Sequence, residues 1–478
     1  MVHPFIQAGL ALCLAAAACA QSTDDLTAEV TGTRLNTQVG LGAVSIDGQI
    51  WQQISVRPEF SIGKIGVALD LTLYFDAEGS IRKEDWDEPA DLLDKIYYVR
   101  WGHKGDPLYV KGGSLDDVTM GYGILVKAYS NAVEYPSVRR TGIEFDVSPG
   151  KLQIEGLLAN IRELNGPGLF ALRASHPVFG KLRAGATLAM DGNLYAGLRD
   201  ADGDNVPDAL DRYSDFNDAS QQAGWRTLHD LNPDLVNGLA DYPGDDWVLG
   251  PLADYSSAEE TVTGIGADLG YELLPNLDVY IQWAKFIDFG NGVAPGVRWQ
   301  PLHWLSAGLE YRDYGDQFIG EFFDRSYDLE RTVFDGDSVL TKREALRTAV
   351  AMSGYYADAR ANVFNLATVF AAYTSMKPKT DTSVDDQNSL RAAAALNMAK
   401  VPKLSELSAY YQQTRVKRLF DLKTPSALHG IRLGYEMAPG VNLVMHWRTS
   451  YVDINGDGRI KGDDETVKTF LIETVFQL

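Results

Sequence analysis

Apolar and polar residues alternate along most of the chain. In the run 441–452 most odd-numbered residues are apolar, and the run 465–478 shows a similar pattern. A period of two predicts a β-strand with one apolar and one polar face. The same alternation occurs at 65–75, 265–273 and 305–312. We therefore predict a protein built of antiparallel strands, with an acidic loop between the last two.

Short turns that contain Gly or Pro divide these runs. They begin at Ser61, His103, Ser148, His176, Leu273, Gln300, Lys400 and Met437, with a less obvious one at Ala359. Between successive turns lie two alternating runs, joined by a connection of variable and often large size. The largest connections cover about residues 196–258 and 316–345. Counting the runs predicts about 20 strands, or 18 if the first hairpin is an N-terminal extension.

The polar faces of the runs carry small and charged residues together, which suits a wet lumen better than a packed core. Short turns at one end and long loops at the other are typical of bacterial outer-membrane barrels, which this chain resembles. The resemblance implies one all-β domain at 21–478, a closed antiparallel transmembrane β-barrel with short periplasmic turns and long external loops. Trp299 and Trp304 flank one short turn, and Trp favours the headgroup boundary of a membrane.

Residues 1–20 are predicted to be a signal peptide, because an apolar core is followed by a small-x-small cleavage pattern around Cys19. A lipidated Cys19 is the alternative. Cys13 and Cys19 are the two cysteines of the chain, so a mature protein cut before Gln21 would have no disulfides. No later stretch holds about 18 consecutive apolar residues, which excludes a helical membrane span.

The formal net charge is −22, and the acidic residues are concentrated in the predicted loops. Nucleic acid and anionic membrane surfaces are therefore poor partners. The loop between the last two strands resembles the calcium loop of EF-hands, and more closely its dockerin variant. A hard cation prefers oxygen ligands, and carboxylates on alternate residues converge when a loop wraps around it. By this resemblance the ligands would be Asp453, Asn455, Asp457 and Asp464, with the carbonyl of Arg459.

A second acidic stretch is similar to the calcium repeats of thrombospondin type 3. Its carboxylates would repel one another strongly without a cation. The implied ligands are Asp200, Asp202, Asp204, Asp208 and Asp211, with the carbonyl of Val206. Under the predicted topology both calcium loops face outside the cell, where millimolar calcium suits weak, loop-ordering sites. An ordinary acidic surface loop is the alternative at each place.

The stretch 112–145 breaks the alternation with glycines, an acidic pair and an arginine pair. In general porins, to which the chain looks distantly similar, a loop folds into the barrel and sets acidic residues opposite arginines. The resemblance implies a constriction whose acidic side is Asp116 and Asp117. Its basic side would be Arg312, Arg432 and Arg448, which lie on predicted inward faces. The alternative is a surface loop, with lumen charges paired for stability.

Enzyme motifs are weak in this sequence. His446 and Ser450 share an inward face, but the pair lacks an orienting group and an oxyanion site. We therefore expect no enzyme, and predict an outer-membrane channel of a Gram-negative-type bacterium for passive diffusion of small solutes, with calcium-ordered external loops. The first alternative is a non-conducting barrel that binds a surface partner or polysaccharide. The second is a secreted, soluble calcium-binding β-protein.

The barrel prediction also implies partners. Outer-membrane lipid would surround the strands, and small solutes would pass through the lumen. The barrel assembly machinery recognises a C-terminal signature that the last strand resembles in Phe470, Ile472, Phe476 and Leu478. A homo-oligomer or a surface lipoprotein partner is a further alternative.

Overall fold

The computed structural model describes residues 38–476 of the chain with several gaps. The gaps are 47–48, 77, 83–85, 87–94, 133–139, 162–167, 196–217, 237–238, 240–241, 243, 245–247, 250–259, 336–337, 365, 381–382, 399–400, 420–422, 425–426, 440, 452–459 and 461–465. The predicted signal peptide, the calcium ligands and Leu478 lie outside the described residues.

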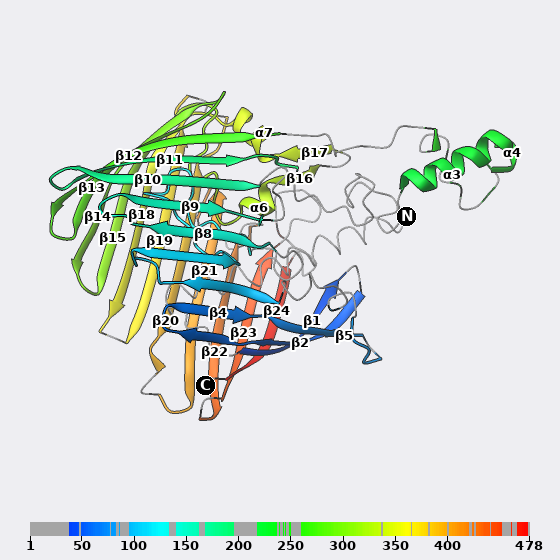
Figure 1. The fold of residues 1–478 in the computed structure, drawn as a ribbon, viewed down its shortest axis with the longest axis horizontal. Helices are drawn as coiled ribbons and strands as arrows, with labels where there is room; N and C mark the ends of the chain where they lie inside the picture. Colours follow the sequence, from blue (N-terminus) through cyan, green and yellow to red (C-terminus); the bar gives the residue numbers. More distant parts are fainter. Residues whose placement is uncertain are drawn as a thin grey trace.

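Strands dominate the described part of the chain (Figure 1). Their bounds are β1 Gln38–Ile46, β2 Gln49–Arg57, β3 Glu59–Ile62, β4 Ile65–Leu69, β5 Leu71–Phe75, β6 Ile96–Trp101, β7 Leu108–Gly113, β8 Gly142–Val147, β9 Gln153–Leu158, β10 Leu169–Phe179, β11 Leu182–Asp191, β12 Val262–Leu274, β13 Leu277–Phe286, β14 Asn291–Leu302, β15 Leu305–Tyr314, β16 Thr332–Asp335, β17 Ser338–Thr341, β18 Met352–Val363, β19 Ala367–Pro378, β20 Gln387–Leu396, β21 Leu404–Val416, β22 Leu428–Ala438, β23 Val441–Tyr451 and β24 Thr466–Phe476.

All of these strands except β16 and β17 belong to one antiparallel sheet of 22 strands. Only Pro58 separates β2 from β3, and only Asp70 separates β4 from β5, so the 22 strands form 20 consecutive spans. Proline has no N–H to donate to a sheet ladder, which accounts for the first break. Across the breaks, β2 pairs with β5 and β3 pairs with β4. The count agrees with the prediction of about 20 strands.

The sheet closes on itself. Each span pairs with the next from β1 to β24, and β1 then pairs with β24 over Gln38–Leu41 and Ile472–Val475. This seam has four residue pairs, whereas β23 and β24 are paired over eleven. The architecture is therefore a closed antiparallel barrel, as the resemblance to outer-membrane barrels implied.

The two faces of the spans differ as the sequence predicted. On β13 the side chains of Ile281 and Trp283 are exposed on the outside, whereas Tyr280, Gln282 and Ala284 are buried on the inside. Exposed leucine, tyrosine and tryptophan side chains continue this outer apolar face on β12, β15, β22 and β23. The inner face carries charge, including the predicted inward residues Arg312, Arg432 and Arg448.

Short turns and long connections lie at opposite ends of the barrel. In Figure 1 the hairpin turn between β12 and β13 is at the left, and the connections with α7, β16 and β17 are at the right. One predicted turn is wrong: residues 359–362 lie inside β18, and the chain turns beyond Val363, whose carbonyl accepts a hydrogen bond from the N–H of Leu366. Small alanines there alternate with Arg360 and Asn362, so they continue the outer face of a strand and do not mark a turn.

The long connections contain the described helices and one two-stranded ribbon. Helices α3 (Asp218–Leu231) and α4 (Pro233–Val236) lie between β11 and β12. Helices α6 (Tyr327–Glu330) and α7 (Lys342–Thr348) lie between β15 and β18, together with the β16–β17 hairpin. None of the helices in the described ranges is long and apolar enough to cross a membrane.

Candidate lumen constriction

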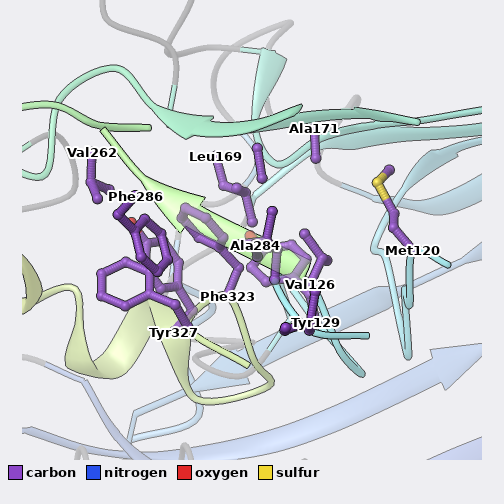
Figure 2. Packing of buried hydrophobic residues seen from close by; sticks show 14 of the residues in the cluster. Met120, Val126, Tyr129, Leu169, Ala171, Val262, Ala284, Phe286, Phe323 and Tyr327 are labelled. Atoms are coloured by element: carbon purple, nitrogen blue, oxygen red, sulfur yellow. The ribbon is translucent and has the colours of Figure 1, made fainter. Parts of the chain in front are cut away.

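Two connections fold against the inner face of the barrel. We call residues 114–132, after β7, the first inward loop, and residues 315–331, after β15, the second inward loop. Their apolar side chains form one buried cluster with inner-face residues of β10–β13 (Figure 2). Figure 2 shows Phe323 and Tyr327 of the second loop gathered with Phe286 of β13, close to Val126 and Tyr129 of the first.

The first inward loop is held to the wall by its backbone and by a stacked ring pair. The N–H of Ile124 donates to Oε1 of Gln282 at 2.9 Å. The ring of Tyr122 lies parallel to that of Tyr280, with 3.8 Å between the centroids. Leu125 occupies space over Gly264, where an added Cβ would lie 2.9 Å from the leucine methyl. Gly264 thus leaves the space that the leucine methyl occupies.

The two loops are joined by backbone hydrogen bonds. The N–H of Lys127 donates to the carbonyl of Phe323 at 3.1 Å, and the N–H of Phe323 donates to the carbonyl of Leu125 at 3.0 Å. The N–H of Glu321 donates to the carbonyl of Ile124 at 2.8 Å. Segments about 200 residues apart in sequence thus form a short parallel β-contact. The contact satisfies buried backbone groups on both sides and joins the two loops into one packed unit.

A chain of four alternating charges ties this contact to the wall. On β15, Arg312 donates to Oε2 of Glu310 at 2.9 Å and to Oε1 of Glu321 at 2.5 Å. Lys127 donates to the same Glu321 oxygen at 2.5 Å. Glu310 also accepts hydrogen bonds from Tyr280 and from Gln282, at 2.8 and 3.1 Å. Each carboxylate is thus paired and hydrogen-bonded, which is what burial of charge requires.

Burial and ion pairing shift the pKa values of Glu321 and Lys127, the two charged loop residues of this chain of charges. Burial alone would raise the pKa of Glu321, but the adjacent Arg312 and Lys127 outweigh it and lower the pKa to about 2. Burial lowers the pKa of Lys127, and the adjacent Glu321 opposes that shift. Both cations also lie over the ring of Tyr356, at 3.5 Å for Lys127 and 4.4 Å for Arg312. Glu321 is therefore ionised through the whole physiological range.

The second inward loop has two further anchors. The hydroxyl of Tyr129 donates to Asp328 at 2.9 Å, which links the two loops again. The hydroxyl of Tyr327 donates to Asp191 at the end of β11, 2.7 Å away, and Arg331 pairs with the same carboxylate at 2.8 Å. The loop thus crosses from β15 to β11 and is fixed at both walls.

The structure gives Asp116, Arg312 and Arg432, three of the predicted constriction residues, different ion-pair partners. Asp116 pairs with Lys111 of β7 at 3.2 Å, and Asp117 adopts a positive φ of 55° in the turn that follows. Arg432 lies on the β21–β23 side of the barrel, where it pairs with Glu406 at 3.2 Å, and Arg448 is buried on β23. A constriction between Asp116, Asp117 and the three arginines stays a prediction.

Sequence reasoning missed Glu321 and Lys127. Glu321 is in a loop predicted to be external, and Lys127 is one of several isolated lysines. The usable signal was the aromatic run around Phe322 and Phe323, because a connection exposed to water rarely carries adjacent phenylalanines. His446, considered with Ser450, instead bonds the hydroxyl of Tyr410 through Nε2 at 2.9 Å.

The predicted calcium loops lie outside the residues that the structure describes. Asp200–Asp211 and Asp453–Asp464 fall in the gaps, apart from Ile460. Among the residues that the structure describes, no group of three or more His, Cys, Asp or Glu side chains is placed to hold a metal ion. Calcium binding stays a prediction.

Comparisons with known proteins give only distant likenesses. No protein-family model and no curated protein matches the chain. Among solved structures it is similar to OccK2 (OpdF) of Pseudomonas aeruginosa in complex with glucuronate, at 11% identity and a TM-score of 0.36 over 93% of this chain and 97% of that one. OccK11 (OpdR) of the same organism matches at 10% identity and 0.33 over 92% and 93%. Its ferric enterobactin receptor PfeA matches at 10% and 0.36 over 93% and 73%. The fold rests on the strand pairings, to which these weak likenesses add nothing.

Proposed function

We propose that the protein is an outer-membrane channel through which small solutes diffuse passively. The observation that carries the proposal is the closed ring of spans with apolar side chains exposed outside and charged side chains inside. In a bilayer every backbone polar group must be satisfied within the protein, and a closed barrel achieves this without an edge. A soluble protein would gain nothing from exposing Trp283, Trp299 and Trp447 on one continuous face.

The two inward loops are the structural basis of selectivity in this proposal. They narrow the lumen next to β10–β15, and their charge chain fixes the position of the loop contact. Because the loops are anchored through Glu321, Asp328 and Asp191, they act as a rigid restriction and not as a freely moving lid. Solutes would be selected by size and by the lumen charges. No chemical step is involved.

The proposal also includes the external position of the long connections and calcium binding within two of them. The long connections would face outside the cell, and calcium bound at 200–211 and 453–464 would order two of them. Outer-membrane lipid would contact the exposed apolar face, and the barrel assembly machinery would insert the chain. A homo-oligomer and a lipoprotein partner are further proposals that would be tested by cross-linking the protein in intact membranes.

Planar bilayer recording tests the channel. The purified protein should insert as stable conducting units whose reversal potential in a salt gradient reports the charge preference. A variant that lacks residues 317–330 should conduct more strongly, because the restriction is removed. If neither protein conducts although both run as heat-modifiable barrels on a gel, the channel proposal is wrong.

One observation favours a non-conducting barrel that binds a surface partner or polysaccharide. The inward loops pack with the wall in one apolar cluster, in which Leu125, Phe322 and Tyr327 are almost fully buried. A folded body of this kind can close a lumen. In that case the wild type would show no ion current, and the variant without residues 317–330 would conduct.

A further inference from the structure

The short-turn end of the barrel carries a charge opposite to that of the protein as a whole. Four successive hairpin turns, 62–65, 101–108, 148–152 and 179–182, contain four lysines and a single acidic residue. The lysines are Lys64, Lys104, Lys151 and Lys181. By contrast, the sequence 76–95, which connects β5 to β6, contains eight acidic and three basic residues. The short turns and this long connection thus differ in the sign of their net charge.

The four turns are neighbours around the rim. The strand after each of these turns pairs with the strand before the next turn. These strand pairs are β4–β6, β7–β8 and β9–β10. Adjacent turns are therefore two strand spacings apart, about 10 Å at ~4.8 Å per strand. The lysines form an arc roughly 30 Å long, with one cation per hairpin. We call these four turns the basic rim.

Large apolar side chains accompany the lysines at the same level. Phe179 and Ile62, each two residues before a lysine, have 83% and 79% of their surface exposed. Trp101 and Leu108 flank Lys104 and are 45% and 44% exposed. An apolar side chain beside a lysine at the end of a strand suits the boundary between acyl chains and headgroups, because the lysine stem packs on apolar surface while its ammonium reaches the phosphates.

The lysines are accessible for such contacts. Lys64 and Lys151 are exposed, and no ion pair of either is seen within the described residues. Lys104 and Lys181 pair with Glu144 and Glu272 but keep about half of their side-chain surface exposed. The acidic residue of the rim, Asp106, accepts a hydrogen bond from the N–H of His103. Lys64 and Lys151 therefore present exposed ammonium groups at the rim.

We propose that the basic rim binds anionic phospholipid headgroups, such as phosphatidylglycerol, in the leaflet that meets the short turns. The inference rests on the proposed membrane location. Charge complementarity carries it, since the acidic long-loop end would repel the same headgroups. A barrel with these opposite ends has one electrostatically favoured orientation, with the basic rim at the anionic phospholipid leaflet.

Native mass spectrometry of the folded barrel in detergent tests the proposal, with phosphatidylglycerol and phosphatidylcholine titrated in parallel. Wild type should bind phosphatidylglycerol more tightly, and the variant with Lys64→Gln and Lys151→Gln should lose roughly 25-fold in affinity, about fivefold for each lysine. High salt should weaken wild-type binding in the same way. The matched control replaces Lys377 and Lys417, two exposed lysines at the long-loop end, and should bind as wild type does.

Three results would overturn the proposal. The first is equal affinity of wild type and variant for phosphatidylglycerol, and the second is an equal loss of affinity in the control. The third is that the two lysines are needed to bind isolated peptidoglycan but not to bind phosphatidylglycerol. The proposed channel is tested separately, because conductance in pure phosphatidylcholine does not depend on the rim. If the variant conducts as wild type does but still binds phosphatidylglycerol as tightly, only the rim proposal fails.

Discussion

Glu321 joins the two inward loops to the wall, so Glu321→Gln should loosen them while the barrel stays folded. The glutamine keeps the shape of the side chain but removes the charge between Arg312 and Lys127. A fall in pKa from 4.5 to about 2 corresponds to roughly 3 kcal/mol at 1.36 kcal/mol per pKa unit. Loss of one partner of a buried ion pair typically costs about 3–5 kcal/mol, and Glu321 is partly exposed, so the lower figure applies.

Hydrogen exchange measures this loss directly. The amides of Glu321, Phe323 and Lys127 are donors in the contact between the loops. A loss of about 3 kcal/mol should speed their exchange by roughly 100-fold if they exchange through separation of the loops. The amides of β13 and β15 should be unaffected, because the barrel ladder does not depend on the charge chain.

Glu344→Gln is the matched control. Glu344 pairs with Arg347 on α7, and both side chains are about half exposed. Exposed pairs contribute only about 0–1 kcal/mol, so exchange in the loops should change little. If Glu321→Gln and Glu344→Gln leave the loop amides equally protected, the charge chain does not hold the loops and the rigid restriction is wrong.

The remaining predictions concern the anchors, the lipid-facing surface, calcium and pH. Asp191→Asn should weaken the second loop at β11 and increase its cleavage by added protease; cleavage equal to wild type would contradict the anchor. Ile281→Lys, on the outer face, should lower the free energy of unfolding in lipid by about 2–4 kcal/mol, and an unchanged urea midpoint would place that face in water. Asp202→Ala together with Asp457→Ala should abolish the heat of calcium binding in calorimetry. Because the folded pKa of Glu321 is below its ordinary value, its stabilising effect is present above about pH 4.5 and is lost as the pH falls towards 2. Current fluctuations should rise over that window in wild type but not in Glu321→Gln.

The spans were predictable because the outer and inner faces of a barrel wall require different residue types at alternate positions of each strand. The predicted run 441–452 covers β23 and one further residue, since most outward positions there are apolar and the alternate positions face inward. Alternation failed at residues 359–362 because alanine suits both a turn and a lipid-facing strand. The break at Asp70 left the alternation intact, so the pattern did not reveal it.

The candidate site was less predictable, for a different reason. Arg312 was placed on an inward face by its own strand, but its partner comes from a loop with no periodicity. Lys127 reaches the same carboxylate from almost 200 residues away. A single sequence carries no local sign of such a pairing, because each loop is buried only by the other. The aromatic residues around Phe322 indicate burial but do not identify the partner.

The seam between β1 and β24 also determines how the barrel can form. Every other neighbour in the ring is a hairpin or a connection within one region of the chain, whereas the seam joins residues more than 400 positions apart through four pairs. When distant segments of a chain are brought together, the chain loses much conformational entropy before new contacts offset that loss. Contacts of this kind therefore form late in folding. The curled but open sheet is therefore the expected long-lived folding intermediate. Its two unpaired edges would be where a chaperone or an insertion factor acts, and where a second open sheet could join by mistake.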